Sequence, residues 1–194
     1  MAIERIYKQP KTAYLFDKVI QYLQDALGGI SWLDHVFGRS ERLVVLRDGV
    51  RKYSPNVYRG RGEYISLLPD NTKLGNYCFF VLEEPQTVTV PMQQLNRVKA
   101  PFSLIVWVDM RKVGADDDDR NTEFIKDQVL ETIRKAWIKK GSVTVERIYD
   151  RAENVFNGYS LDEVDNQYLM SPFAGFRFTG EFITDEDCVI TTNN

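Results

Sequence analysis

The sequence predicts an α+β fold, an antiparallel β-sheet with two long helices packed on one face and a long Tyr/Arg-rich loop. Three observations predict it. Two segments have apolar residues at the helical period, several others have the alternation of strands, and the segment 102–110 is apolar on both of its faces. Strands that follow one another along the chain favour antiparallel pairing, so both helices are expected to cover one sheet.

The first helix is expected over residues 12–27. Thr12 is placed to cap it, and Gly28 follows its last residue. Its apolar side chains recur at spacings of three and four, which places them on one face: Leu15, Phe16, Val19, Ile20, Leu23, Ala26 and Leu27. This stripe predicts a helix that packs against the core.

A strand and a long loop are expected next. Residues 42–47 (RLVVLR) are apolar and β-branched and end at Asp48-Gly49, which predicts a strand followed by a turn. From Lys52 to Tyr64 a proline and two glycines interrupt a stretch in which tyrosines and arginines alternate. We interpret this stretch as a partly ordered loop, within an insertion at about 48–76.

The middle of the chain predicts the centre of the sheet. Residues 77–83 and 86–90 have the composition of two strands of a meander. Residues 102–110 (FSLIVWVDM) form the clearest strand. Because Ile105 and Trp107 are apolar and lie on the face opposite to its other apolar residues, both faces of this strand are expected to be covered.

The second helix is expected from Asn121 or Thr122 to about Lys140, where Gly141 stops it. Its apolar stripe has an unbroken spacing of four: Ile125, Val129, Ile133 and Trp137. A polar loop that contains Asp116–Asp119 precedes it.

Two further strands and a short helix are expected after it. Residues 143–149 alternate as a strand does, and Ser160 with Glu163 forms a capping box for a short helix to about Met170. The closing strand, 173–183, is expected to place three phenylalanines on one face: Phe176, Phe178 and Phe182.

Length and composition predict one α+β domain over residues 1–188, with 189–194 as a flexible C-terminal tail. The net charge of −3 argues against a protein that coats nucleic acid along its whole surface. The sequence contains no stretch of 18 apolar residues and no signal-peptide pattern, so no membrane segment is expected. Cys78 and Cys188 lack a CxxC spacing and are expected to be inert thiols in a reducing compartment.

Candidate catalytic and metal-binding groups are few. His35 lies beside Asp34, but no GxSxG motif accompanies it, and a packing role is the better interpretation. The acidic block Asp116–Asp119 lacks the spaced acids and central glycine of an EF-hand. Glu83 and Glu84 are neighbours on a strand and point to opposite faces. No catalytic residue, metal ligand or cofactor is therefore predicted, and the chain is not expected to be an enzyme.

The charges are unevenly distributed along the sequence. Between Arg39 and Tyr64 there are seven basic residues and three acidic ones, whereas from Asp150 to Asp187 there are nine acids and two arginines. These blocks either are simply solvated or make complementary head-to-tail contacts between copies. Because Tyr and Arg are enriched in protein interfaces, the predicted contact residues are Arg51, Tyr53, Tyr58, Arg59, Arg61 and Tyr64, with Glu181 and Asp185 as acidic counterparts.

Four segments together resemble tailed-phage tail-terminator and neck ring (head-tail connector) proteins: LFDKVIQYLQDAL, FSLIVWVDM, NTEFIKDQVLETIRKAWIKKG and GFRFTGEFITDEDC. In those proteins an opening helix leads through a β-meander and a central apolar strand to a second long helix and a closing strand. The resemblance is one of overall plan, and it covers about residues 1–30 and 77–188. The family has no catalytic residues to carry over.

The resemblance implies a non-enzymatic virion structural protein of a tailed bacteriophage, assembled in the host cytoplasm. It would form a homo-oligomeric neck or tail-completion ring, of six- or twelve-fold symmetry, between portal and tail. Its partners would be further copies, the portal, neck or tail proteins, and DNA that passes through the ring, but no membrane. The alternative is an adaptor or binding module whose basic Tyr/Arg loop contacts nucleic acid or an acidic protein.

Overall fold

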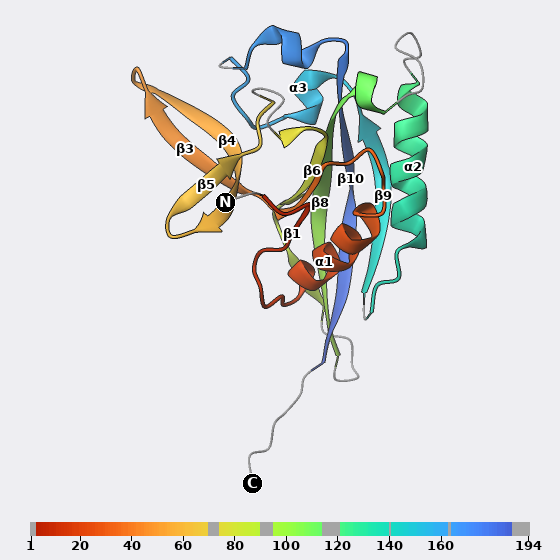
Figure 1. Cartoon of the computed structure of the whole chain (residues 1–194). Coiled ribbons are helices and arrows are strands. Elements are labelled where there is room, and N and C mark those ends of the chain that lie inside the picture. Colours follow the sequence, from red (N-terminus) through yellow and green to blue (C-terminus); the bar gives the residue numbers. More distant parts are fainter. Residues whose placement is uncertain are drawn as a thin grey trace.

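The computed structural model describes residues 3–69, 74–89, 95–113, 121–139, 141–162 and 164–187. A main sheet with two helices forms the body, and a smaller sheet projects from its side (Figure 1). The expected acidic loop at Asp116–Asp119, the expected capping residue Glu163 and the tail from Cys188 onward lie outside the described residues.

The main sheet is mixed and mostly antiparallel. Its strands follow the order β1 (Ile6–Tyr7), β2 (His35–Arg39), β6 (Tyr77–Leu82), β8 (Leu95–Asp109), β10 (Phe173–Asp187) and β9 (Gly141–Tyr149), and β7 (Thr87–Thr89) also pairs with β8. The pairs β1–β2 and β2–β6 are parallel, and the remaining pairs are antiparallel. The α+β class is confirmed, whereas β1 and β2 carry too weak a strand pattern to be predicted.

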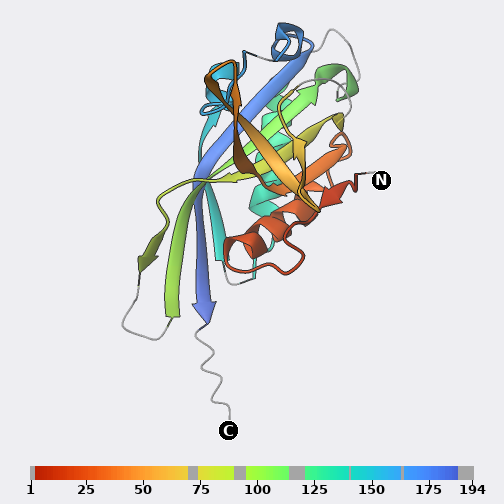
Figure 2. The same cartoon turned by 90° about the vertical axis from the view of Figure 1, so that its left-hand side faces the viewer.

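The expected meander of residues 77–83 and 86–90 is wrong. Both β6 and β7 pair with β8 and follow each other along the same strand, with Leu82 opposite Phe102 and Thr87 opposite Lys99. This arrangement is possible because β8 begins at Leu95, earlier than the apolar pattern indicated. Figure 2 shows β8 and β10 running together beyond the rest of the body.

Helices α1 (Phe16–Leu27) and α2 (Thr122–Lys135) pack on the same face of the main sheet, as predicted. Their buried side chains meet alternate residues of the central strands. This first core includes Val19, Leu23, Ile125, Val129, Ile133, Phe80, Leu104, Val106, Phe176, Phe178 and Phe182. The predicted phenylalanine face of the closing strand is therefore confirmed.

The ends of both helices differ from the prediction. α1 begins at Phe16, and Leu15 occupies its N-cap without a side-chain hydrogen bond, so Thr12 does not cap it. Asn121 caps α2 as predicted, because its side chain accepts a hydrogen bond from Phe124 N. α2 ends at Lys135, since the backbone becomes extended at Ala136, and this change of direction leaves Trp137 74% exposed instead of in the stripe.

A second core lies on the other face of the main sheet, so the prediction that both faces of 102–110 are covered is confirmed. Helices α3 (Ala152–Val155) and η3 (Asn166–Leu169) cover part of this face. Buried members of this core are Phe37, Val57, Leu67, Tyr77, Phe79, Ile105, Trp107, Val155 and Phe156. The short helix expected from Ser160 to about Met170 is confirmed at its end and wrong at its start, since in the described residues of this stretch the 3₁₀ helix η3 forms with Asp165 at its N-cap.

The expected Tyr/Arg-rich loop is instead a three-stranded antiparallel sheet, β3 (Glu41–Arg47), β4 (Val50–Gly60) and β5 (Glu63–Ser66), which we call the arm. Pro55 has no N–H to donate to a neighbouring strand. It fits within β4 because its backbone faces the position just beyond the end of β5, where the ladder requires no donor, and its carbonyl accepts a hydrogen bond from Leu67 N. The glycines at 60 and 62 occupy the β4–β5 turn, with φ of 102° and 79°. The predicted strand 42–47 and the turn at Asp48-Gly49 are confirmed.

Candidate protein interface

The arm is tied to the body at its base. Val57 belongs to the second core, and Tyr7 Oη donates a hydrogen bond to Tyr58 O at 3.2 Å. Ser160 holds β4 through two backbone contacts, accepting from Tyr53 N at 3.0 Å on its Oγ and donating its own N–H to Tyr53 O at 2.8 Å. The Lys52 ammonium forms an ion pair with Asp162. These contacts fix the arm's direction and leave its outer half projecting (Figure 1).

The projecting half carries aliphatic side chains that no part of the chain covers fully. Their exposed fractions are 54% for Val44, 47% for Val45, 69% for Leu46 and 55% for Val50. Because side chains alternate along a strand, Val44 and Leu46 lie on one face of the arm, and Val45 and Val50 on the other. Clustered exposure of this kind makes the projecting half of the arm the candidate surface for contact with another molecule.

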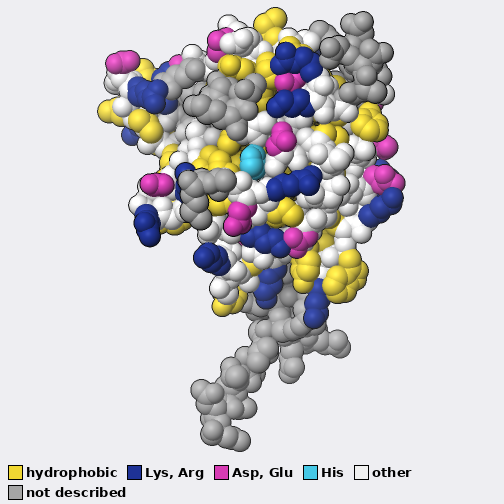
Figure 3. All heavy atoms as spheres, viewed as in Figure 1, with side chains coloured by type: hydrophobic (Ala, Val, Ile, Leu, Met, Phe, Trp, Pro, Cys, Tyr) yellow, Lys and Arg dark blue, Asp and Glu magenta, His cyan; other side chains and the backbone are white. Residues whose placement is uncertain are grey.

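Basic side chains surround these aliphatic residues. Figure 3 shows hydrophobic and basic side chains side by side on the arm. The Arg42 guanidinium lies over the Tyr53 ring at 4.0 Å from its centroid, and the exposed Arg51 lies opposite Leu46. Arg61 is also exposed, but it lies at the other end of β4. A surface of aliphatic side chains with a basic surround can bury apolar area and pair with carboxylates at its rim.

The six predicted Tyr and Arg contact residues all lie on the arm, but they are divided between the two ends of β4. Arg51 and Tyr53 lie on β4 toward the tip, and Arg61 lies in the β4–β5 turn with a φ of 55°. Tyr58 and Tyr64 face each other across β4 and β5 with ring centroids 5.3 Å apart. Arg59, the sixth residue, is half-buried on β4.

The Tyr64 hydroxyl also contacts a charged neighbour. It donates to Glu41 Oε2 at 3.4 Å, and desolvation together with this carboxylate raises the pKa of Tyr64. Tyr64 is thus a neutral donor at physiological pH that links β5 to β3.

The predicted acidic counterparts lie elsewhere in the structure. Glu181 is on β10 in the main sheet, and its Oε2 pairs with Lys99 Nζ at 3.0 Å. The backbone of Asp185 pairs with Arg97, whereas its side chain lies outside the described residues. That these acids meet the arm of another copy stays a prediction.

The exposed aliphatic residues were not singled out by the sequence. Four apolar residues in a row, Leu43 to Leu46, indicate a strand with apolar side chains on both faces. Such a pattern is equally typical of a strand buried in its own chain. Only the projection of the arm shows that the described parts of the chain leave these side chains exposed.

A buried polar cluster lies near the base of the arm. Arg177 donates through Nη2 to Glu83 Oε1 at 2.6 Å and through Nε to Ser103 Oγ at 2.9 Å, while Ser103 Oγ donates to the same carboxylate at 3.0 Å. Ser103 is fully buried, so a substrate cannot reach its hydroxyl. The cluster joins β8, β10 and the end of β6, and its geometry is that of a structural ion pair.

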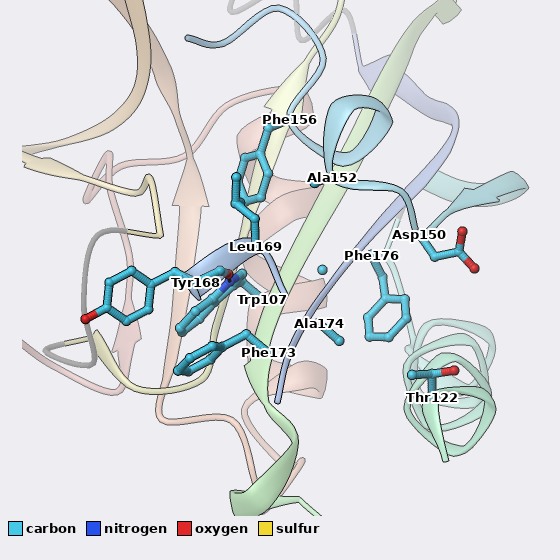
Figure 4. A pocket seen from close by; sticks show the side chains of 11 residues that line it. Trp107, Thr122, Asp150, Ala152, Phe156, Tyr168, Leu169, Phe173, Ala174 and Phe176 are labelled. Atoms are coloured by element: carbon cyan, nitrogen blue, oxygen red, sulfur yellow. Dashed lines mark hydrogen bonds between the residues drawn. The ribbon is translucent and has the colours of Figure 1, made fainter. Parts of the chain in front are cut away.

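An aromatic pocket of about 230 Å³ opens between η3, α3 and the central strands (Figure 4). The Trp107 and Phe173 rings stack at 4.9 Å, and Trp107 Nε1 donates to Tyr168 O at 3.1 Å. Asp150, at the side of the pocket nearest Thr122, pairs with Lys126 at 3.2 Å. The volume is below that of ordinary ligand pockets, and the one carboxylate that lines it, that of Asp150, is held in this ion pair.

The remaining reactive side chains have packing partners. The His35 ring lies 5.7 Å from that of Phe37, and its Nδ1 is 3.2 Å from Glu4 O. Cys78 is buried in the first core, which raises the pKa of its thiol far above the usual range. Within the described parts of the chain, no three His, Cys, Asp or Glu side chains converge on a common metal position.

Sequence comparison with known proteins gives no relative. No protein-family model matches the chain, and no curated protein matches it. The described helices are too short or too polar to cross a membrane.

Proposed function

We propose that this protein is a non-enzymatic structural subunit that assembles with copies of itself through the arm. The observation that carries the proposal is the exposure of Val44, Val45, Leu46 and Val50 on a projecting but firmly anchored sheet. Full burial of one such side chain stabilises an assembly by about 1.5–3 kcal/mol. A rigid arm also loses little conformational entropy when it docks.

We further propose that the assembly is a neck or tail-completion ring in the virion of a tailed bacteriophage, with portal, neck or tail proteins as neighbours. What supports this is the resemblance in overall plan. The chain runs from α1 through strands to the apolar β8, then to α2 and the closing strand β10. A gene neighbourhood that encodes portal, capsid or tail proteins is expected, and its absence would count against the phage setting alone.

The assembly role is tested with a double substitution at the arm tip, Val44→Ser with Leu46→Ser. Phe124→Ser on α2 is the matched control, since Phe124 is 45% exposed and lies far from the arm in sequence and on another element. Particle mass from light scattering and ring images from negative-stain electron microscopy are the readouts. We expect the arm variant to lose the assembly at an unchanged melting temperature and the control to keep it. An arm variant that assembles like wild type contradicts the proposal.

A second candidate function has its own observation. The exposed arginines Arg42, Arg51 and Arg61 on the arm would suit an adaptor that binds nucleic acid or an acidic protein. Binding of a fixed-length DNA duplex, measured by fluorescence anisotropy at several salt concentrations, separates the two functions. An adaptor would bind more weakly after Arg51→Gln with Arg61→Gln and would show a smaller salt dependence. The exposed aliphatic residues favour self-assembly, because phosphate groups would leave them uncovered.

A further inference from the structure

The outer strand of the arm has an open edge. Among the strands that the structure describes, β3 pairs with β4 alone. It is an edge of seven residues with exposed aliphatic side chains and no proline or bulge. Edges of this kind are templates for a strand from another molecule.

The hydrogen bonds of β4 show which groups point outward from β3. Tyr53 and Pro55 direct their backbone groups away from β3, toward Ser160 and Leu67. In an antiparallel ladder, two opposite residues that do not bond to each other both direct their backbone N–H and C=O groups away from the partner strand. Val44 lies opposite Tyr53, and Arg42 lies opposite Pro55. By the same alternation, Arg42, Val44 and Leu46 present their N–H and C=O groups at the open edge.

We propose that β3 of one copy pairs with β3 of a second copy, antiparallel, with Val44 opposite Val44 on a two-fold axis. In this register each Arg42 lies opposite a Leu46, so all three outward-pointing residues of each strand exchange backbone hydrogen bonds. A shift of the register by two residues would leave one of the three without a partner.

The side chains favour the same register. β3 reads ERLVVLR, with an acid at its start and a base at its end. Antiparallel pairing about Val44 sets Glu41 opposite Arg47 at both ends of the ladder and Leu43 opposite Val45 between them. Opposite charges and aliphatic pairs directly across a ladder stabilise it, whereas like charges destabilise it. This self-complementarity is why we assign the edge to a second copy.

This inference rests on the proposed self-assembly and specifies one contact between the copies, the pairing of β3 with β3. A two-fold contact is complete after two copies, so alone it produces a dimer. A ring requires a separate head-to-tail contact, and together the two contacts would produce assemblies with an even number of subunits.

Amide hydrogen exchange tests the ladder directly. With the full chain at rising concentration, we expect the amides of Arg42, Val44 and Leu46 to become protected while the dimer forms. The amides of Leu43 and Val45 bond within the arm and should be protected at every concentration. Uniform behaviour of the five amides, or a chain that stays monomeric with an exchanging edge, would overturn the proposal.

Charge reversal tests the register. Glu41→Arg should weaken the dimer by about tenfold or more in Kd, since two like-charge pairs replace two opposite ones. Arg47→Glu should do the same, and the double variant should restore the wild-type Kd. Tyr64→Phe is the control, because it removes only the internal hydrogen bond to Glu41. Near-UV circular dichroism checks that each variant is folded. A dimer that ignores both single reversals would overturn this register.

The two proposals fail separately. If Val44→Ser with Leu46→Ser abolishes assembly but the amides of Arg42, Val44 and Leu46 stay unprotected, the arm is a subunit contact and β3 pairing is wrong. If the dimer follows the charge reversals but no larger assembly forms with any virion partner, β3 pairing holds and the proposed ring is wrong.

Discussion

Arg177 shows how a single side chain fixes the body of the protein. It lies on β10, and its guanidinium reaches Ser103 on β8 and Glu83 beyond the end of β6. The Arg177 side chain is mostly buried. Its charge is therefore compensated within the fold, and removing Glu83 would leave the Arg177 guanidinium mostly buried without its ion pair. Neither Arg177 nor Glu83 could be paired from the sequence, since the contact depends on which strands are neighbours.

At the same scale, Ile133→Asp tests the placement of α2. Ile133 is buried between α2 and the main sheet, so the substitution introduces an unpaired charge into the first core. We expect a loss of several kcal/mol in the free energy of unfolding, enough to prevent folding. Arg134→Asp, one position along on the exposed side of the helix, is the control and should fold. Circular dichroism and urea unfolding are the measurements, and a cooperatively folding Ile133→Asp variant would contradict the placement.

The Asp109 carboxylate makes the stability of the fold depend on pH in acid solution. It accepts two hydrogen bonds from the Arg111 guanidinium, at 2.9 and 2.8 Å, and these lower the pKa of Asp109 below its ordinary value of 3.8. In the unfolded chain the Asp109 carboxylate takes up its proton near pH 3.8, whereas in the folded protein it does so only at lower pH. The stabilisation is therefore complete above about pH 4 and is lost as the pH falls through the lowered pKa of the folded state. Asp109→Asn should flatten the decline of melting temperature below about pH 4. Arg111→Gln should flatten it likewise, and a decline as steep as that of wild type in both variants would show that this pair contributes nothing.

At the scale of elements, the arm stands apart from the body in its energetics. Tyr58→Ala with Arg59→Ala removes an exposed cross-strand tyrosine pair but leaves the bond from Tyr7 to the Tyr58 carbonyl. We expect a loss of about 1 kcal/mol in stability, as for a cross-strand pair, together with weaker assembly. Ser160→Ala provides the comparison, because it removes the hydrogen bond from Tyr53 N to Ser160 Oγ and leaves the exposed face of the arm unchanged. Differential scanning calorimetry and particle mass distinguish these effects. Loss of most of the unfolding enthalpy would instead place the arm in the cooperative core.

The elements also show what the sequence could and could not predict. Both helices, their shared face and the two-sided burial of β8 follow from periodicity, since in these elements the apolar pattern reports burial of the element's own side chains. The apolar, β-branched pattern of β3 also predicts a strand, although the β3 side chains are exposed. The arm did not follow, because Pro55 and two turn glycines resemble loop signals until the partner strands are known. For the same reason the six Tyr and Arg residues were predicted as contacts, whereas the exposed Val and Leu residues of β3 were missed.

At the scale of the whole molecule, two parts extend beyond the compact body. The arm projects on one side, and the paired ends of β8 and β10 extend in another direction (Figures 1 and 2). A body that presents separate extensions can contact different neighbours at once, which suits a subunit of a larger assembly better than an enzyme built around one cleft. The backbone carries both extensions as regular ladders, so they are stiff.

The tip of the arm is expected to be dispensable for folding of the rest of the chain. Deleting Leu46, Arg47, Val50 and Arg51 joins Val45 to Asp48 and Gly49 to Lys52, which lie opposite each other in the ladder. The deletion should therefore preserve the two-residue turn and the alternation of inward- and outward-pointing backbone groups along both strands. It should also preserve the contact of Tyr53 with Ser160 and that of Lys52 with Asp162. We expect the melting temperature to stay within a few degrees of wild type, because the deleted side chains are exposed. Assembly should be lost, since half of the exposed aliphatic surface and the Arg47 partner of Glu41 are removed. Calorimetry with light scattering measures both outcomes. A strongly lowered melting temperature would make the tip part of the folding unit, whereas intact assembly would move the subunit contact away from the arm.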